Sequence, residues 1–191
     1  MTQQTERRMT ELLEAYSRLE TDVRTLMTRL FSPTCGLCTS CCCRTDICEE
    51  AVESAFLSQL INRQGIKSDD LDSRSGWLGL HGCILEYGKP PVCNAYFCDD
   101  ILARLPDEDA RFSTKVLGKL MHHVGMDALN GLHLVHIRNR EDFAQLDYDR
   151  LMIRMAETQA AYEAITTYME SGRLTTPLRE KLQLITTDEP D

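Results

Sequence analysis

The 191-residue chain is poor in aromatic residues, which make up 6% of it, and tryptophan occurs once, at Trp77. It also lacks an excess of positive charge, because its formal net charge is −9. A protein that binds mainly the phosphate backbone of a nucleic acid needs a basic surface, so this class of partner is excluded. The sequence has no apolar stretch of membrane-spanning length, and its N-terminus lacks the apolar core of a signal peptide. These absences predict a cytoplasmic protein with no nucleic-acid partner and no membrane partner.

Several catalytic motifs are missing as well. The sequence contains no glycine-rich phosphate loop, no Gly-x-Ser-x-Gly and no His-Glu-x-x-His. A cysteine–histidine nucleophile would lie in an unusual setting here, because many other thiols surround it. Whether the protein is an enzyme is therefore left open by the sequence.

Cysteine, in contrast, is abundant and clustered. Six of the nine cysteines fall within residues 35–48. They are Cys35, Cys38, Cys41, Cys42, Cys43 and Cys48. The first three repeat a Cys-x2-Cys spacing, which points pairs of sulfurs at one metal ion and also begins the cysteine run of bacterial ferredoxins. In the cytosol such a cluster indicates metal binding or redox chemistry rather than a disulfide framework.

A second group consists of Cys83, Cys93 and Cys98. Two cysteine groups separated by a helix-length insert are typical of a metal that joins distant loops. The consecutive prolines Pro90 and Pro91 stiffen the approach to Cys93. We expect the metal to order the two cysteine-bearing loops, 32–48 and 76–98. The alternative, a set of free reactive thiols, is disfavoured because thiols at this density would oxidise.

Together, the two groups resemble the Cys-x2-Cys-x2-Cys-Cys cluster family, known as YkgJ-type proteins or the zinc- or iron-chelating domain. The resemblance covers roughly residues 31–102. The matching positions are Cys35, Cys38, Cys41, Cys42, Cys83, Pro90, Cys93, Tyr96 and Cys98. Lys89 stands where the family has arginine, and Glu86 where it has tyrosine. Cys43 and Cys48 fall outside the family pattern.

The resemblance implies a metal ion or cluster, either zinc or an iron–sulfur cluster, bound by the matching cysteines. These are Cys35, Cys38, Cys41, Cys42, Cys83, Cys93 and Cys98. The leading interpretation is a metal-binding cysteine-cluster protein with a structural, metal-handling or electron-transfer role. The alternative is an iron–sulfur- or metal-dependent enzyme that modifies another protein, because flagellin lysine N-methylases carry a similar cluster.

The hydrophobic periodicity predicts a mainly α fold in a single domain, 1–191. Helices would hold the two cysteine-bearing loops at a metal centre, with at most a few short strands. The three parts would be a long N-terminal helix within 1–31, a cysteine-cluster region at 32–102 and a helical region at 107–191. The predicted helices cover 3–31, 49–62, 96–105, 107–124, 141–171 and 177–184. Short extended pieces are expected at 77–82 and a strand at 132–137.

The N-terminal helix carries apolar residues three and four positions apart from Met9 to Leu30, and Ser32-Pro33 should end it. We expect this seam to pack within the chain, antiparallel to the helix 141–171. The alternative is a protein partner or a homodimer through the N-terminal helix. Glu20 and Arg24 are expected on its solvent-facing sides.

The five histidines are interpreted as surface or core residues, because cysteines already supply enough metal ligands. His81 alone is a candidate to support or replace a ligand, since it precedes Cys83 by two positions. Asp99 and Asp100 are interpreted as solvated charges at the start of a helix.

Overall fold

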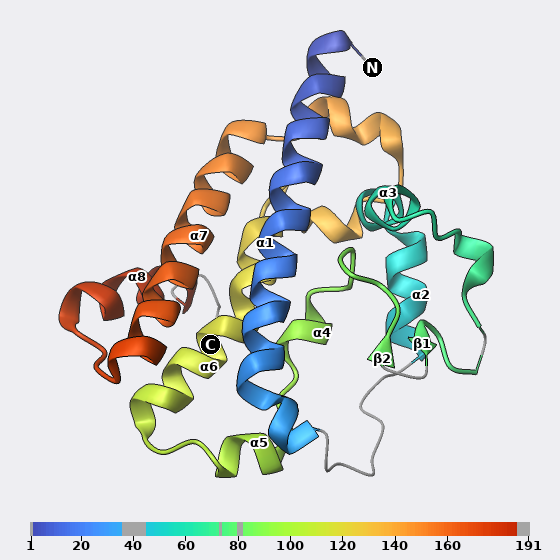
Figure 1. The fold of residues 1–191 in the computed structure, drawn as a ribbon. Coiled ribbons are helices and arrows are strands. Elements are labelled where there is room, and N and C mark those ends of the chain that lie inside the picture. Colours follow the sequence, from blue (N-terminus) through green and yellow to red (C-terminus); the bar gives the residue numbers. More distant parts are fainter. Residues whose placement is uncertain (1, 36–44, 73, 80–81, 187–191) are drawn as a thin grey trace.

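The computed structural model describes residues 2–35, 45–72, 74–79 and 82–186. The fold is mainly α, as predicted, with one two-stranded antiparallel hairpin among the described residues. The central element is α1 (Gln3–Cys35), which runs through the molecule from end to end (Figure 1). In the described part of the chain, no helix is both long and apolar enough to cross a membrane.

The remaining elements lie on both sides of α1. Helices α6, α7 and α8 lie on one side, whereas α2, α3 and the hairpin lie on the other (Figure 1). In chain order they are α2 (Thr45–Glu53), α3 (Ala55–Arg63), η1 (Ser68–Asp70), β1 (Leu78–Gly79), β2 (Gly82–Cys83), α4 (Val92–Ala95), α5 (Asp99–Ala103), α6 (Glu108–Gly125), η2 (Leu134–His136), η3 (Arg140–Gln145), α7 (Tyr148–Ser171) and α8 (Thr176–Thr186).

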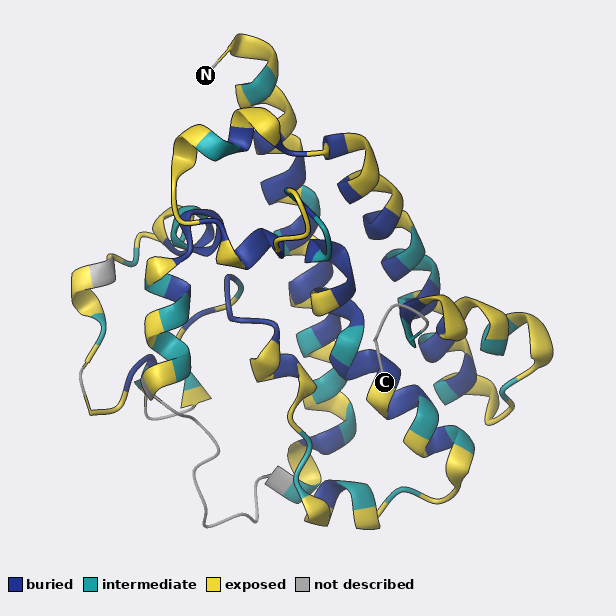
Figure 2. Cartoon of the chain, turned by 180° about the vertical axis from the view of Figure 1, so that it is seen from behind, coloured by how far each residue is buried: buried dark blue, intermediate teal, exposed yellow. Residues whose placement is uncertain are grey.

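The apolar seam of α1 is buried within its own chain. Leu12, Tyr16 and Val23 have no exposed surface, and the Tyr16 ring meets Phe56 of α3 edge-on with the centroids 5.0 Å apart. Figure 2 shows buried residues concentrated on the helices at the centre of the molecule. A homodimer through α1 would therefore need another face of this helix.

The predicted antiparallel pairing of the two long helices is wrong. The start of α1 lies beside the start of α7: Arg8 is 3.6 Å from the Asp149 carboxylate and lies over the Tyr148 ring. The two helices therefore run in the same direction (Figure 1). The antiparallel neighbour of α7 is instead α6. His123 near the end of α6 contacts Glu157 in the first half of α7. Tyr168 near the end of α7 contacts Asp107 at the start of α6.

Two helix boundaries predicted in the first half of the chain are also wrong. Helix α1 continues past Pro33 to Cys35, since a proline in the last turn removes only one backbone hydrogen bond. The single helix predicted over 49–62 is two helices. The Ser54 hydroxyl caps α3 by accepting the Leu57 N–H, and the Ala55 N–H donates to the Ile137 carbonyl instead of continuing α2.

In the second half, the strand expected at 132–137 is a short 3₁₀ helix, η2. Its first turn is capped by the ring of His133, which accepts the Val135 N–H. Helix α7 begins at Tyr148 rather than at residue 141, because Asp147 caps it by accepting the Arg150 N–H. Gly172 ends α7 in the left-handed conformation, as the sequence predicts. The helix predicted over 96–105 is the shorter α5.

Candidate metal centre

The predicted ligands fall into two groups according to what the structure describes. Cys35 is the last residue of α1, and its side chain is not described. The predicted ligands at 38, 41 and 42 lie outside the described residues, as does His81. Cys83 on β2 is half-buried, as is Cys98 before α5, whereas Cys93 on α4 is exposed. Cys48, Cys83 and Cys98 form no disulfide, so each can bind a metal as a thiolate once it is deprotonated.

Cys48 lies near Cys83. The sequence did not predict this proximity, because Cys48 falls outside the family pattern. Burial raises the pKa of the Cys48 thiol, and the nearby charge of Cys83 raises it further. The backbone N–H of Trp77, which donates a hydrogen bond to the Cys48 sulfur, lowers this pKa. Helix α2 and the β1–β2 hairpin therefore place one thiol from each cysteine group close enough for their charges to interact.

A second contact joins the end of α1 to the segment before Cys98. Phe31 lies one helical turn before Cys35, and its ring meets that of Phe97 edge-on with the centroids 5.3 Å apart. The α4 segment that leads to Phe97 lies against α6 at Gly118, where an added Cβ would be 3.0 Å from the Ala95 Cα. Only a glycine permits this close approach without a shift of backbone.

The loop that joins Cys83 to Cys93 is bound by two charged residues of α1. The Glu20 carboxylate accepts the Gly88 N–H at 2.7 Å and the Lys89 N–H at 3.1 Å. One turn further on, the Arg24 guanidinium donates to the backbone carbonyls of Leu85 and Glu86. The expectation that Glu20 faces solvent is wrong, because its side chain has no exposed surface.

Helix α3 binds the same loop from the other side. The side chain of Gln64, which follows α3, accepts the Glu86 N–H at 2.8 Å and donates to the Tyr87 carbonyl at 2.9 Å. Between Pro90 and Cys93 the chain turns directly into α4, with the Cys93 N–H donating to the Pro90 carbonyl at 2.9 Å. The path from Cys83 to Cys93 is therefore fixed by hydrogen bonds to two helices.

Lys89 is a buried cation within this network, with 6% of its surface exposed. Burial lowers the pKa of its ammonium group, and the nearby Arg24 charge lowers it too, whereas the negative charges of ionised Cys83, Glu20 and Cys93 favour the charged form. Metal centres bound by several thiolates carry negative charge, so an ammonium group between two cysteines suits them electrostatically.

Burial of Glu20 raises the pKa of its carboxyl group from the ordinary value of 4.5 to about 7. Between these two pH values the folded protein holds a proton that the unfolded chain has lost, so the contribution of Glu20 to stability falls as the pH rises. Relative to a Glu20→Gln variant, the free energy of unfolding of the native protein should fall by about 3 kcal/mol between pH 4.5 and 7. Urea denaturation of both proteins over this range measures the difference, and two parallel pH profiles would contradict it.

The histidines and acids fit their predicted structural roles. His123 is buried and lies 2.8 Å from the Glu157 carboxylate. The His133 ring donates to the His122 carbonyl, and burial lowers its pKa to about 4, so it is neutral near pH 7. Asp99 and Asp100 are exposed in the first turn of α5.

Among the described residues alone, no group of three or more histidine, cysteine, aspartate or glutamate side chains could hold a metal ion. A complete site would thus include cysteines from the segment between Cys35 and Thr45. No family model, curated protein or solved structure matches the chain.

Glu20, Arg24 and Gln64 belong to the candidate site although the sequence did not indicate them. Their partners are 22 to 69 positions away in the chain, as the Gln64–Glu86 and Glu20–Lys89 pairs show. The only sequence feature that could have pointed to these residues is the position of Glu20, which lies one position after the seam residue Leu19 and four before Arg24.

Proposed function

We propose that this protein binds a metal through its two cysteine groups and has a structural, metal-handling or electron-transfer role. The bound group would be an iron–sulfur cluster or zinc, held by Cys35, Cys38 and Cys41 together with cysteines of the second group. In this arrangement one metal centre joins two cysteine-bearing segments that are held by a helical scaffold. An iron–sulfur cluster would supply reversible electron transfer, and zinc a rigid cross-link.

One observation carries this proposal: the fold delivers the second cysteine group to both ends of the segment that carries the first. Cys83 lies beside Cys48 of α2, just after that segment. The residue before Cys98 packs on Phe31, one turn before the segment begins. Because Glu20, Arg24 and Gln64 fix the loop from Cys83 to Cys93, the second cysteine group loses little chain entropy when its thiolates bind a metal.

The donor set favours thiophilic metals. Thiolates select zinc and iron–sulfur clusters over magnesium or calcium, which prefer oxygen ligands. The Cys-x2-Cys-x2-Cys run can supply three corners of one cluster, and a cysteine of the second group the fourth, which favours iron–sulfur over zinc.

Anaerobic purification followed by iron, sulfide and zinc analysis and a visible absorption spectrum tests the proposal. We expect stoichiometric iron and sulfide with a brown colour that air bleaches. A colourless protein with stoichiometric zinc would remove the iron–sulfur assignment and keep the metal-binding function. A folded protein free of both metals would overturn the proposal.

Metal removal should loosen the two cysteine-bearing segments unequally. We expect chelation to expose residues 32–48 to protease, because these residues contain little apolar material to order them. Residues 85–91, expected from the sequence to loosen as well, should stay protected, since Glu20, Arg24 and Gln64 bind their backbone. Limited proteolysis with mass spectrometry, with and without a chelator, measures this, and circular dichroism should show the long helices intact. Equal protection of 32–48 in both states would contradict the coupling.

A further inference from the structure

Lys89 is a buried cation whose ammonium group has no hydrogen-bond acceptor among the described residues. Its side chain is 6% exposed. The one hydrogen bond that Lys89 donates within this part of the chain comes from its backbone N–H, which lies 3.1 Å from the Glu20 carboxylate. Lysine is rarely buried to this extent unless an anion faces it, because the buried charge loses its hydration.

The neighbouring charges on α1 do not compensate this cation. The Arg24 guanidinium group donates to the backbone carbonyls of Leu85 and Glu86, and its charge repels the Lys89 ammonium group. The Glu20 carboxylate attracts the ammonium group, but burial raises the pKa of that carboxyl group to about 7. Near neutral pH, Glu20 therefore carries only part of a negative charge beside two cations.

The other negative groups near Lys89 in the described part of the chain are the thiols of Cys83 and Cys93, once they are ionised. A cysteine thiol is mostly neutral at pH 7, whereas a cysteine that binds a metal is deprotonated. Metal binding thus creates, beside Lys89, the negative charge that the metal-free protein lacks.

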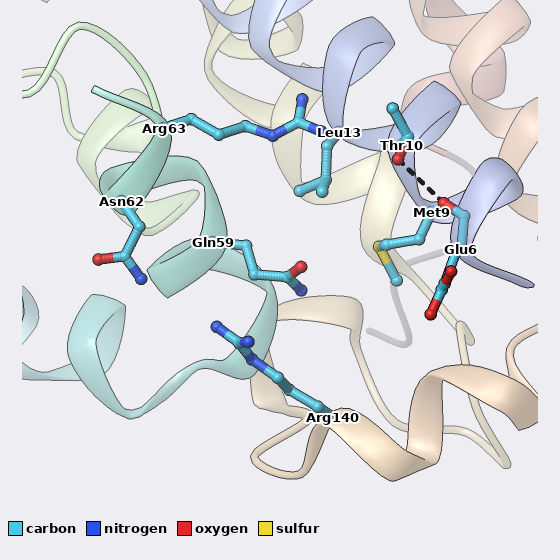
Figure 3. A pocket seen from close by; sticks show the side chains of 8 residues that line it. All are labelled: Glu6, Met9, Thr10, Leu13, Gln59, Asn62, Arg63 and Arg140. Atoms are coloured by element: carbon cyan, nitrogen blue, oxygen red, sulfur yellow. Dashed lines mark hydrogen bonds between the residues drawn. The ribbon is translucent and has the colours of Figure 1, made fainter. Parts of the chain in front are cut away.

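A ligand in one of the surface hollows would not supply this charge. The hollow between α1, α3 and η3 has a volume of about 250 Å³, and Glu6, Gln59 and Arg140 are among the residues that line it (Figure 3). A second hollow lies beside the start of α7. No residue of 83–93 lines either hollow, so an anion bound there would not meet Lys89.

We propose that the Lys89 ammonium group is the counter-charge of the metal centre, which stabilises the metal-bound thiolates of Cys83 and Cys93. This inference rests on the proposed metal binding. Loss of the positive charge should weaken the hold on the metal, whether it is zinc or iron. For an iron–sulfur cluster, a nearby cation also favours the reduced form, because reduction adds one electron and so one negative charge.

A Lys89→Met variant of the full-length, metal-loaded protein tests this role, since methionine fills a similar volume without the charge. We expect EDTA to remove metal from Lys89→Met at least tenfold faster than from the native protein. Lys89→Arg should stay close to the native rate, because it keeps the positive charge. Lys67→Met is the matched control, since Lys67 is exposed, and it should lose metal at the native rate.

The reduction potential separates charge from packing when the metal is iron. Anaerobic titration with dithionite, followed by visible absorption, should give Lys89→Met a potential that is lower by about 59 mV or more, which is a tenfold change in a one-electron equilibrium. A variant that only loosens the packing would lose metal faster at an unchanged potential. Circular dichroism establishes that each variant is folded.

The outcomes distinguish this inference from the metal binding on which it rests. If Lys89→Met keeps its metal as long as the native protein does, the counter-charge role is overturned and the metal binding stands. Equally fast loss from Lys89→Met and Lys89→Arg would also overturn it, because packing and not charge would then be the cause. A native protein that binds no metal would overturn both.

Discussion

Serine in place of Cys35, Cys38, Cys41 or Cys93 is expected to remove most of the bound metal from the purified protein. The first three cysteines repeat one spacing and can converge on a common point, while Pro90 and Pro91 direct the chain into Cys93. A hydroxyl is a poor ligand for a thiophilic metal, so the loss of one such thiolate opens the site. Metal content per chain, measured for single variants purified anaerobically, gives the result.

The other cysteines should follow in a defined order. Variants at Cys42, Cys83 and Cys98 should lose less metal than the first four. Cys43→Ser is the matched control, because Cys43 lies in the same segment but outside the family spacing, and its metal content should be nearly unchanged. A strong loss at Cys43 with none at Cys93 would contradict the proposed ligand set.

The structure changes the metal content that we expect for a Cys48→Ser variant. The sequence places it with Cys43, outside the family pattern, and predicts little effect of Cys48→Ser. The structure places its thiol near Cys83, and its sulfur accepts a hydrogen bond from the backbone N–H of Trp77. We therefore expect Cys48→Ser to lower metal content about as much as Cys83→Ser does, and an unchanged metal content would return Cys48 to the role of a bystander.

The fold was predictable where the signal is local. The seam from Met9 to Leu30 predicted α1, the acid at Asp107 predicted the start of α6, and Gly172 predicted the end of α7. One error occurred where a distant group decides the local structure. The break between α2 and α3 depends on a hydrogen bond from Ala55 to Ile137, a carbonyl 82 positions away, which no local pattern encodes.

The candidate site shows the same division. The spacing of the cysteines is visible in the sequence because ligands in one turn must lie near one another in the chain. The groups that hold the loop between them are not visible, since a glutamate one position from a helical seam looks like an ordinary solvent-facing charge. Glu20 is distinguished only by its partners, Gly88 and Lys89, and these are set by tertiary packing.

Above pH 7, where the Glu20 carboxyl group is ionised, Glu20→Ala is expected to lower the free energy of unfolding strongly. It would leave the buried N–H groups of Gly88 and Lys89 without an acceptor and would remove a nearby negative charge from the buried Lys89 ammonium. Removal of one partner from a buried charged network costs about 3–5 kcal/mol, which is a large part of the stability of an ordinary domain. Urea denaturation of the metal-loaded protein measures this loss.

The same variant should also lose metal, because the loop from Cys83 to Cys93 would no longer be fixed on α1. Glu14→Ala is the matched control, since Glu14 is exposed on the same helix and has no partner role in this loop. Glu20→Gln should lie between the two: it keeps one acceptor oxygen for the loop and lacks the charge. If Glu20→Ala unfolds at the same urea concentration as Glu14→Ala and binds as much metal, then the loop is held by its prolines and by Gln64, and the contacts to α1 add little.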